Sequence, residues 1–206
     1  MLRTRTLLFA LTALSTALVA EDFGPVVKAA GLIFPGRTHY GVVCNYDHSR
    51  ALVADLLHAL PEGSTLTVVD AHNPAQIGAA GSVIASRGVQ MLALLPSDPL
   101  VRDGSPYATG LVHRFNRTAA NFGNTPQKEW AGSIPAFGTT PAALQNGCAL
   151  AMGKATGWEL MLNPDLVDPG LKGIIGPIEI TQTPSVARMN PLNLPGATLY
   201  VVSLAR

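Results

Sequence analysis

Short apolar runs and amphipathic stretches alternate over the first half of the chain, and this alternation constrains the fold more than any other feature. The runs at 40–44, 65–69 and 89–95 are rich in Val, Leu and other residues that favour buried strands. Between them, residues 51–60 and 77–86 place apolar side chains at the three- and four-residue spacing of a helix. Strands that alternate with helices over short connections favour a parallel sheet covered on both faces. The sequence therefore predicts a three-layer α/β/α fold around an open, mainly parallel sheet.

The rest of the chain is less regular but extends this pattern. A short helix is predicted over 26–33, before the first strand. The later elements are a helix over 111–122, a short strand over 134–140, a short helix over 141–145, a segment of either kind over 147–153, and strand-like pieces over 173–181 and 197–204.

The N-terminus has the pattern of a secretory signal. Two arginines within residues 1–5 precede an uncharged run, rich in Leu and Ala, over 7–20, and Glu21 ends it. The run is shorter than the roughly 20 apolar residues that span a bilayer. We therefore expect a signal peptide over 1–20 and a periplasmic or secreted protein, with an uncleaved N-terminal anchor as the alternative. A lead-in segment (21–37) and a single domain (38–206) would follow.

The composition narrows the choice of partners. The net charge is +1 and no block of Lys and Arg could neutralise a run of phosphates, so no nucleic acid is expected as a partner. No second long apolar stretch follows the N-terminal one, so no membrane span is expected after signal cleavage. An oxidising compartment permits a disulfide between Cys44 and Cys148, but two cysteines alone do not indicate one, and we favour buried free thiols.

Polar residues follow each predicted strand at the edge where parallel α/β sheets bind ligands. The ligand-binding candidates are Asn45, Tyr46, Asp47, His48, Ser49, Ser97, Asp98, Gly138, Thr139 and Thr140. Residues 70–73 follow the second strand at the same edge. Helix N-termini there would suit a carboxylate or a phosphate. The alternative is that Asp47, Ser49, Asn73 and Asp98 only cap helices.

Signatures of catalysis and of metal binding are missing from the sequence. There is no Gly-x-Ser-x-Gly elbow and no glycine-rich phosphate loop after a strand, and Ser97 lies between prolines. His48 and His72 fall at the same predicted edge, but no His-x-x-x-His pair accompanies them. We therefore expect no catalytic residue, no metal ligand and no cofactor.

Four segments carry a family resemblance: Gly41-Val42-Val43-Cys44-Asn45-Tyr46, Leu94-Leu95-Pro96-Ser97-Asp98, Ile134-Pro135-Ala136-Phe137-Gly138-Thr139 and Gly147-Cys148-Ala149-Leu150. Their order and spacing over about 38–162 resemble one lobe of the ABC transporter substrate-binding proteins of the periplasmic binding protein type I-like family. The resemblance implies an exported solute-binding or sensory domain that binds a small molecule, such as an amino acid or a small carboxylate. It implies no enzymatic activity.

The chain departs from that family because the first of the usual two lobes is missing. A lone lobe cannot enclose a ligand by hinge closure. The alternative function is therefore a non-catalytic protein–protein interaction module of the cell envelope that has lost ligand binding. The sequence also predicts a monomer or a weak dimer in which 101–133, with Tyr107, Leu111 and Phe115, folds as a lid that partly covers the carboxyl ends of the strands. The alternative assembly is a two-fold dimer that restores a cleft from two identical lobes.

Overall fold

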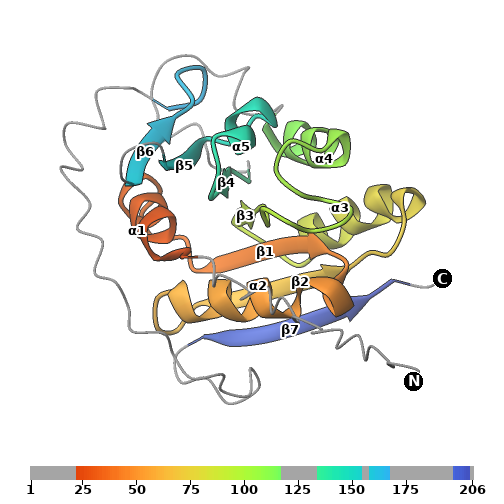
Figure 1. Ribbon diagram of the computed structural model, residues 1–206. Helices are drawn as coiled ribbons and strands as arrows, with labels where there is room; N and C mark the ends of the chain where they lie inside the picture. The colour runs from red at the N-terminus through yellow and green to blue at the C-terminus, as the bar shows by residue number, and fades with distance from the viewer. Residues whose placement is uncertain (1–21, 117–133, 155–157, 168–196, 205–206) are drawn as a thin grey trace, which may run out of the picture.

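The computed structural model describes residues 22–116, 134–154, 158–167 and 197–204 (Figure 1). The strands that it describes form one sheet in the order β6-β5-β4-β3-β1-β2-β7. They are β1 (His39–Cys44), β2 (Thr65–Asp70), β3 (Met91–Ala93), β4 (Ala136–Gly138), β5 (Leu150–Lys154), β6 (Trp158–Leu162) and β7 (Thr198–Ser203). All neighbouring strands are parallel except β6, which runs antiparallel to β5.

Helices cover both faces of this sheet (Figure 1). They are α1 (Gly24–Ile33), α2 (Tyr46–Ala59), the 3-10 helix η1 (Pro74–Gln76), α3 (Ile77–Ser86), α4 (Pro106–Asn116) and α5 (Ala142–Gln145). Side chains of α1 and α2 belong to one hydrophobic core cluster, and side chains of α3, α4 and α5 belong to a second one on the opposite face. The predicted three-layer α/β/α fold with an open, mainly parallel sheet is confirmed.

Strand β1 shows why its sequence is apolar throughout. Val42 and Cys44 pack into the cluster with α1 and α2, while Val43 packs into the cluster with α3 and α4. A central strand that is buried on both faces needs apolar side chains on both. Gly41 lies where no side chain fits, because a Cβ atom there would come within 2.7 Å of Cγ1 of Val89.

The two cysteines lie on opposite faces of the sheet. Cys44 belongs to the cluster with α1 and α2, and Cys148 to the cluster with α3 and α4. Both are buried free thiols, so they form no disulfide. Burial raises the pKa of each thiol well above its usual range, and the carboxylates of Asp98 and Asp70 add to this effect at Cys44.

The first long helix begins at an earlier residue than the sequence predicts. Helix α2 starts at Tyr46, so the polar residues 46–49 form its first turn instead of a loop before it. Residues 147–153, for which the sequence allows either a helix or a strand, form the turn before β5 and most of that strand. Residues 158–162 form the antiparallel edge strand β6. The predicted strand at 173–181 lies outside the described residues.

The predicted lid is wrong for the part of 101–133 that the structure describes. Residues 106–116 form α4, which packs against α3 on one face of the sheet, where Leu111 and Phe115 are buried in the core. An amphipathic helix between two parallel strands buries its apolar side on the sheet, and α4 connects β3 to β4 in this way. Residues 117–133 lie outside the described residues. None of the described helices is long and apolar enough to cross a bilayer.

Candidate functional site

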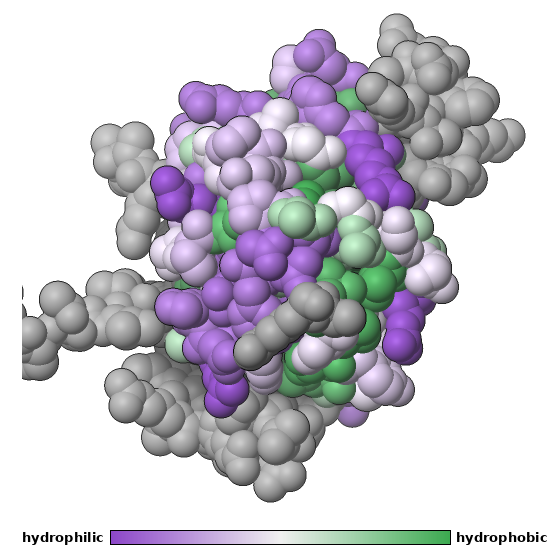
Figure 2. Space-filling view, turned by 90° about the vertical axis from the view of Figure 1, so that its right-hand side faces the viewer, coloured by the Kyte–Doolittle hydropathy of each residue, from purple (hydrophilic) through white to green (hydrophobic). Residues whose placement is uncertain are grey.

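The carboxyl ends of the central parallel strands meet at one edge of the sheet. The strand arrows of β1, β2 and β7 point toward this edge in Figure 1, and Figure 2 views the molecule from that side. Hydrophilic residues form a broad band across this face, beside a more hydrophobic area (Figure 2). We call residues 45–50, 70–73, 97–103 and 138–140 the carboxyl edge. Every sequence-predicted ligand-binding residue lies within it.

Asp98 is a charged residue of the carboxyl edge with no exposed surface. Its Oδ2 atom accepts hydrogen bonds from the backbone N–H of Asn45 at 2.9 Å and from the hydroxyl of Ser49 at 2.6 Å. Its Oδ1 atom accepts from the N–H groups of Leu100 and Val101 at 2.8 and 2.6 Å. Four donors therefore use the carboxylate completely, and it ties the start of α2 to the loop after β3. This side chain and Ser49 hold the edge together and do not face a ligand.

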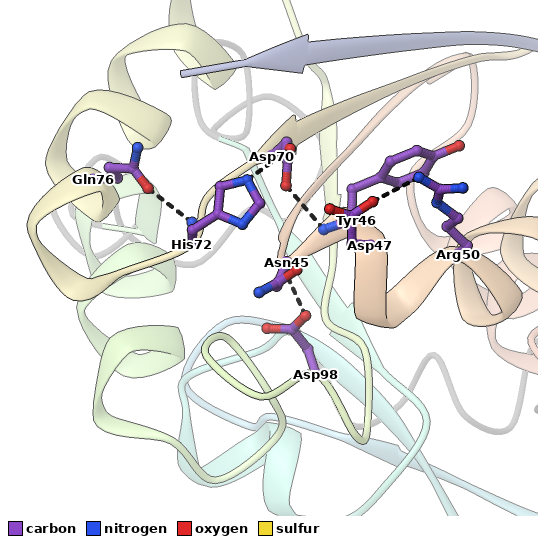
Figure 3. Close-up of polar contacts among 8 residues, drawn as sticks. All are labelled: Asn45, Tyr46, Asp47, Arg50, Asp70, His72, Gln76 and Asp98. Atoms are coloured by element: carbon purple, nitrogen blue, oxygen red, sulfur yellow. Dashed lines mark hydrogen bonds and ion pairs between the residues drawn. The ribbon is translucent and has the colours of Figure 1, made fainter. Parts of the chain in front are cut away.

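Asp70, at the end of β2, makes the second connection to α2 (Figure 3). Its Oδ1 atom accepts from the N–H of Tyr46 at 3.0 Å, and its Oδ2 atom lies 3.1 Å from Nε2 of His72. The N–H of His72 in turn donates to Oε1 of Gln76 at 2.8 Å. The carboxyl ends of β1 and β2, the start of α2 and the turn before α3 thus form one hydrogen-bonded group.

A third carboxylate, Asp103, organises the end of β4. Its Oδ2 atom accepts from both the N–H and the hydroxyl of Thr140, at 3.2 and 2.7 Å. The side chain packs so closely that a Cβ atom on Gly138 would come within 3.0 Å of Oδ1 of Asp103, and closer still to the Cβ of Ala143. Glycine at 138 is therefore required by this close approach.

Buried side-chain oxygen atoms without a hydrogen-bond partner occur among the described residues of the carboxyl edge, and two of them bear on binding. These two are Oδ1 of Asn45, at the start of α2, and Oγ1 of Thr139, directly after β4. Thr139 is 4% exposed. Buried polar atoms in folded proteins almost always have a partner, either in the protein or in bound solvent. These two atoms are therefore the groups at this edge that a bound molecule or water would satisfy.

The remaining candidates are exposed or half-buried around these atoms. Asp47 and His48 are exposed on the first turn of α2, and Ser97 is exposed in the loop after β3. Asp47 forms a salt bridge of 2.6 Å with Arg50, whose guanidinium carbon lies 5.4 Å from the centre of the half-buried Tyr46 ring. These side chains can contact a molecule that lies on the edge.

The expectation that helix N-termini here would bind an anion needs correction. The chain's own side chains already occupy these positions: Asp70 and Asp98 at α2, Asn73 at η1, and Ser105 at α4. The capping alternative therefore describes Asn73, whose Oδ1 accepts from the N–H of Ala75. It does not describe Asp98, whose backbone donors lie outside the helices, Asp47, which pairs with Arg50, or Ser49, which donates to Asp98.

The sequence placed Asp70 and His72 at this edge without naming them as ligand-binding candidates, and it missed Asp103. Asp70 and His72 fall in the segment after the second predicted strand, and an Asp at the end of a buried parallel strand is a recognisable signal. Asp103 is followed by Gly104, a dipeptide typical of a turn. Asp103 follows an isolated bridge between Leu95 and Arg102, which periodicity does not reveal. Within the described residues, no three His, Cys, Asp or Glu side chains form a group that could hold a metal ion.

Comparisons with known proteins identify no family. No family model matches the chain, and no curated protein matches it. The chain is similar to a crystal structure described as a conserved domain protein from Vibrio cholerae O1 biovar El Tor strain N16961, with a TM-score of 0.49 and 16% sequence identity. The similarity covers 78% of this chain and 58% of that protein, so the chain spans less than two thirds of its length.

Proposed function

We propose that the protein is an exported solute-binding or sensory domain that holds a small molecule at the carboxyl edge. The observation that carries the proposal is the pair of buried oxygens, Oδ1 of Asn45 and Oγ1 of Thr139, that have no partner. Leaving a buried polar atom unpaired costs about 1–3 kcal/mol. A polar molecule bound at this edge would remove that cost, which favours binding.

The family resemblance supports the same function. It implies an amino acid or a small carboxylate as the ligand, a periplasmic or secreted location, and neither a catalytic step nor a cofactor. The segments that carry the resemblance include Asn45, Ser97, Asp98 and Thr139, all of which lie at the carboxyl edge.

A thermal-shift screen with amino acids, amines and small carboxylates tests this function. A ligand at 100 times its dissociation constant adds about 2.7 kcal/mol of stability, which for a domain of this size raises Tm by about 5–10 °C. Asn45→Leu should abolish the shift, because it removes the unpaired acceptor. Asn163→Leu is the matched control, since Asn163 follows β6 and its Oδ1 accepts from the N–H of Asp165. The absence of any shift across the whole panel would contradict solute binding.

The second candidate function is the interaction module of the cell envelope, and the edge strand β7 favours it. Tyr200 and Val201 are exposed on this strand, at 51% and 41%, and no charged residue lies within it. Uncharged edge strands can pair with an extended segment of another protein. A photoreactive amino acid at Tyr200 should then cross-link a partner in intact cells, while the same group at the exposed Tyr107 on α4 should not. Equal labelling from both positions would argue against β7 as the docking strand.

A further inference from the structure

The carboxyl edge carries more negative than positive charge. Its carboxylates are Asp47, Asp70, Asp98 and Asp103, and its guanidinium groups are Arg50 and Arg102. Four negative and two positive charges give a formal charge of −2 with neutral histidines. Arg50 is already paired with Asp47. The field at this edge therefore favours the approach of a cation over that of an anion.

Three backbone donors at this edge that could bind an anion are already occupied. The N–H of Tyr46 donates to Asp70, and the N–H of Asn45 donates to Asp98. The N–H of Thr140 donates to Asp103 at the other end of the edge. An anionic ligand would have to displace the chain's own carboxylates from these donors, and it would meet their charge while doing so.

The unpaired atoms call for donors from the ligand. The amide oxygen of Asn45 can only accept hydrogen bonds, and the hydroxyl of Thr139 can accept as well as donate. Thr139 follows Phe137 by two residues and so lies toward the face of the sheet that α1 and α2 cover, whereas Asn45 follows Val43, which packs on the face with α3 and α4. A carboxylate has no proton to give to Asn45. A protonated amine has three.

We infer that the carboxyl edge recognises its small molecule through a protonated amine and rejects small carboxylates that lack one. The inference rests on the proposed solute-binding function and narrows its ligand to ammonium compounds, amino acids included. The amine would donate to Oδ1 of Asn45 or to Oγ1 of Thr139, and the two amines of a diamine would donate one to each, in the field of the neighbouring carboxylates. An organic cation fits this edge better than a bare metal ion, because the described residues hold no group of metal ligands.

Three probes with a four-carbon skeleton test the inference: 1,4-diaminobutane, 4-aminobutanoate and butanedioate. Their binding to the full chain is measured by titration calorimetry at 20 and 200 mM NaCl. The two amines should bind, and butanedioate should bind at least about tenfold more weakly than either. Binding of the diamine should weaken at the higher salt concentration, because salt screens exposed charges.

Two buried hydroxyls provide a matched pair of variants. Thr139→Val keeps the shape of the side chain and removes the hydroxyl, so affinity for 1,4-diaminobutane should fall by about tenfold, the loss expected for one hydrogen bond to a charged group. Ser64 also has a buried hydroxyl without a partner, but it lies before β2 at the opposite end of the strands. Ser64→Ala should leave the affinity unchanged.

The outcomes separate this inference from the function on which it rests. Binding of butanedioate without binding of either amine overturns the inference and leaves solute binding in place. If the diamine binds Thr139→Val as tightly as the unmodified chain, its amine lies elsewhere and the inference is also wrong. If the three probes and the broad panel of amino acids, amines and carboxylates all fail to bind, the proposed function itself fails.

Discussion

Replacing Asp98 should destabilise the protein more than replacing any other carboxylate described at the carboxyl edge. Asp98→Ala leaves four donors without their acceptor: the N–H groups of Asn45, Leu100 and Val101 and the hydroxyl of Ser49. Each unsatisfied buried donor costs about 1–3 kcal/mol. The flanking residues Ser97 and Pro99 are exposed, so water can reach part of the vacated space. We therefore take the lower figure for each donor and expect a loss of about 4 kcal/mol.

Asp98→Asn should cost about half as much, since an amide keeps one acceptor oxygen. That oxygen can still accept from Leu100 and Val101, and the Ser49 hydroxyl can turn to accept from the new NH2 group. Only the N–H of Asn45 then loses its acceptor, and the remaining hydrogen bonds no longer involve a charged group. We therefore expect the free energy of unfolding to fall by about 2 kcal/mol.

Urea denaturation followed by far-ultraviolet circular dichroism measures these differences, provided that the slope of the free energy of unfolding with urea is unchanged. Asp47→Ala is the control, because its exposed pair with Arg50 should contribute less than about 1 kcal/mol. The reasoning fails if Asp98→Ala loses less than 1 kcal/mol, or if the asparagine variant is as unstable as the alanine variant.

Two further predictions concern the interior. Gly41→Ala should destabilise the protein by about 1–3 kcal/mol, because the new Cβ would overlap Val89 and Ile84. Gly110→Ala in α4 should stabilise the protein by up to about 1 kcal/mol, because the new Cβ would lie in open space. Thermal melts should therefore show a lower Tm for the first variant and a higher Tm for the second. Cys44 and Cys148 should resist a thiol reagent in the native state and react in denaturant. Their raised pKa values mean that the unfolded chain loses these protons first, so stability should fall above about pH 9 by about 1.4 kcal/mol per pH unit for each thiol. Replacing both cysteines by alanine should reduce this slope, and a slope unchanged by the replacement would contradict the assignment.

The layered fold was predictable because its strands and helices differ in hydrophobic period. Strands buried on both faces give continuous apolar runs such as 40–44, and the helices between them carry apolar residues at helical spacing. The location of the candidate site followed from the same topology, since the carboxyl ends of parallel strands share an edge.

The roles of individual residues at that edge were not predictable in the same way. The sequence places Asp98 after a strand, as it would place a ligand-binding carboxylate. Whether such a side chain faces a ligand or the start of α2 depends on the angle at which the loop after β3 returns to the sheet. That angle is set by contacts between residues far apart in the chain, such as Asn45 with Asp98. Periodicity carries no information about such pairs.

The position of β7 has a consequence for the order in which the sheet assembles. Thr65 pairs with Thr198, so in an unfolded chain the β2–β7 ladder closes a loop of roughly 130 residues at an entropic cost of about 4 kcal/mol. The β5–β6 hairpin joins Lys154 to Trp158 and closes its loop for about 1 kcal/mol. Strand β7 also has exposed residues along its length, so the burial of its side chains offsets little of this entropic cost. We therefore expect β7 to join the sheet after the other described strands, and to be the first of them that the native protein releases without unfolding its core.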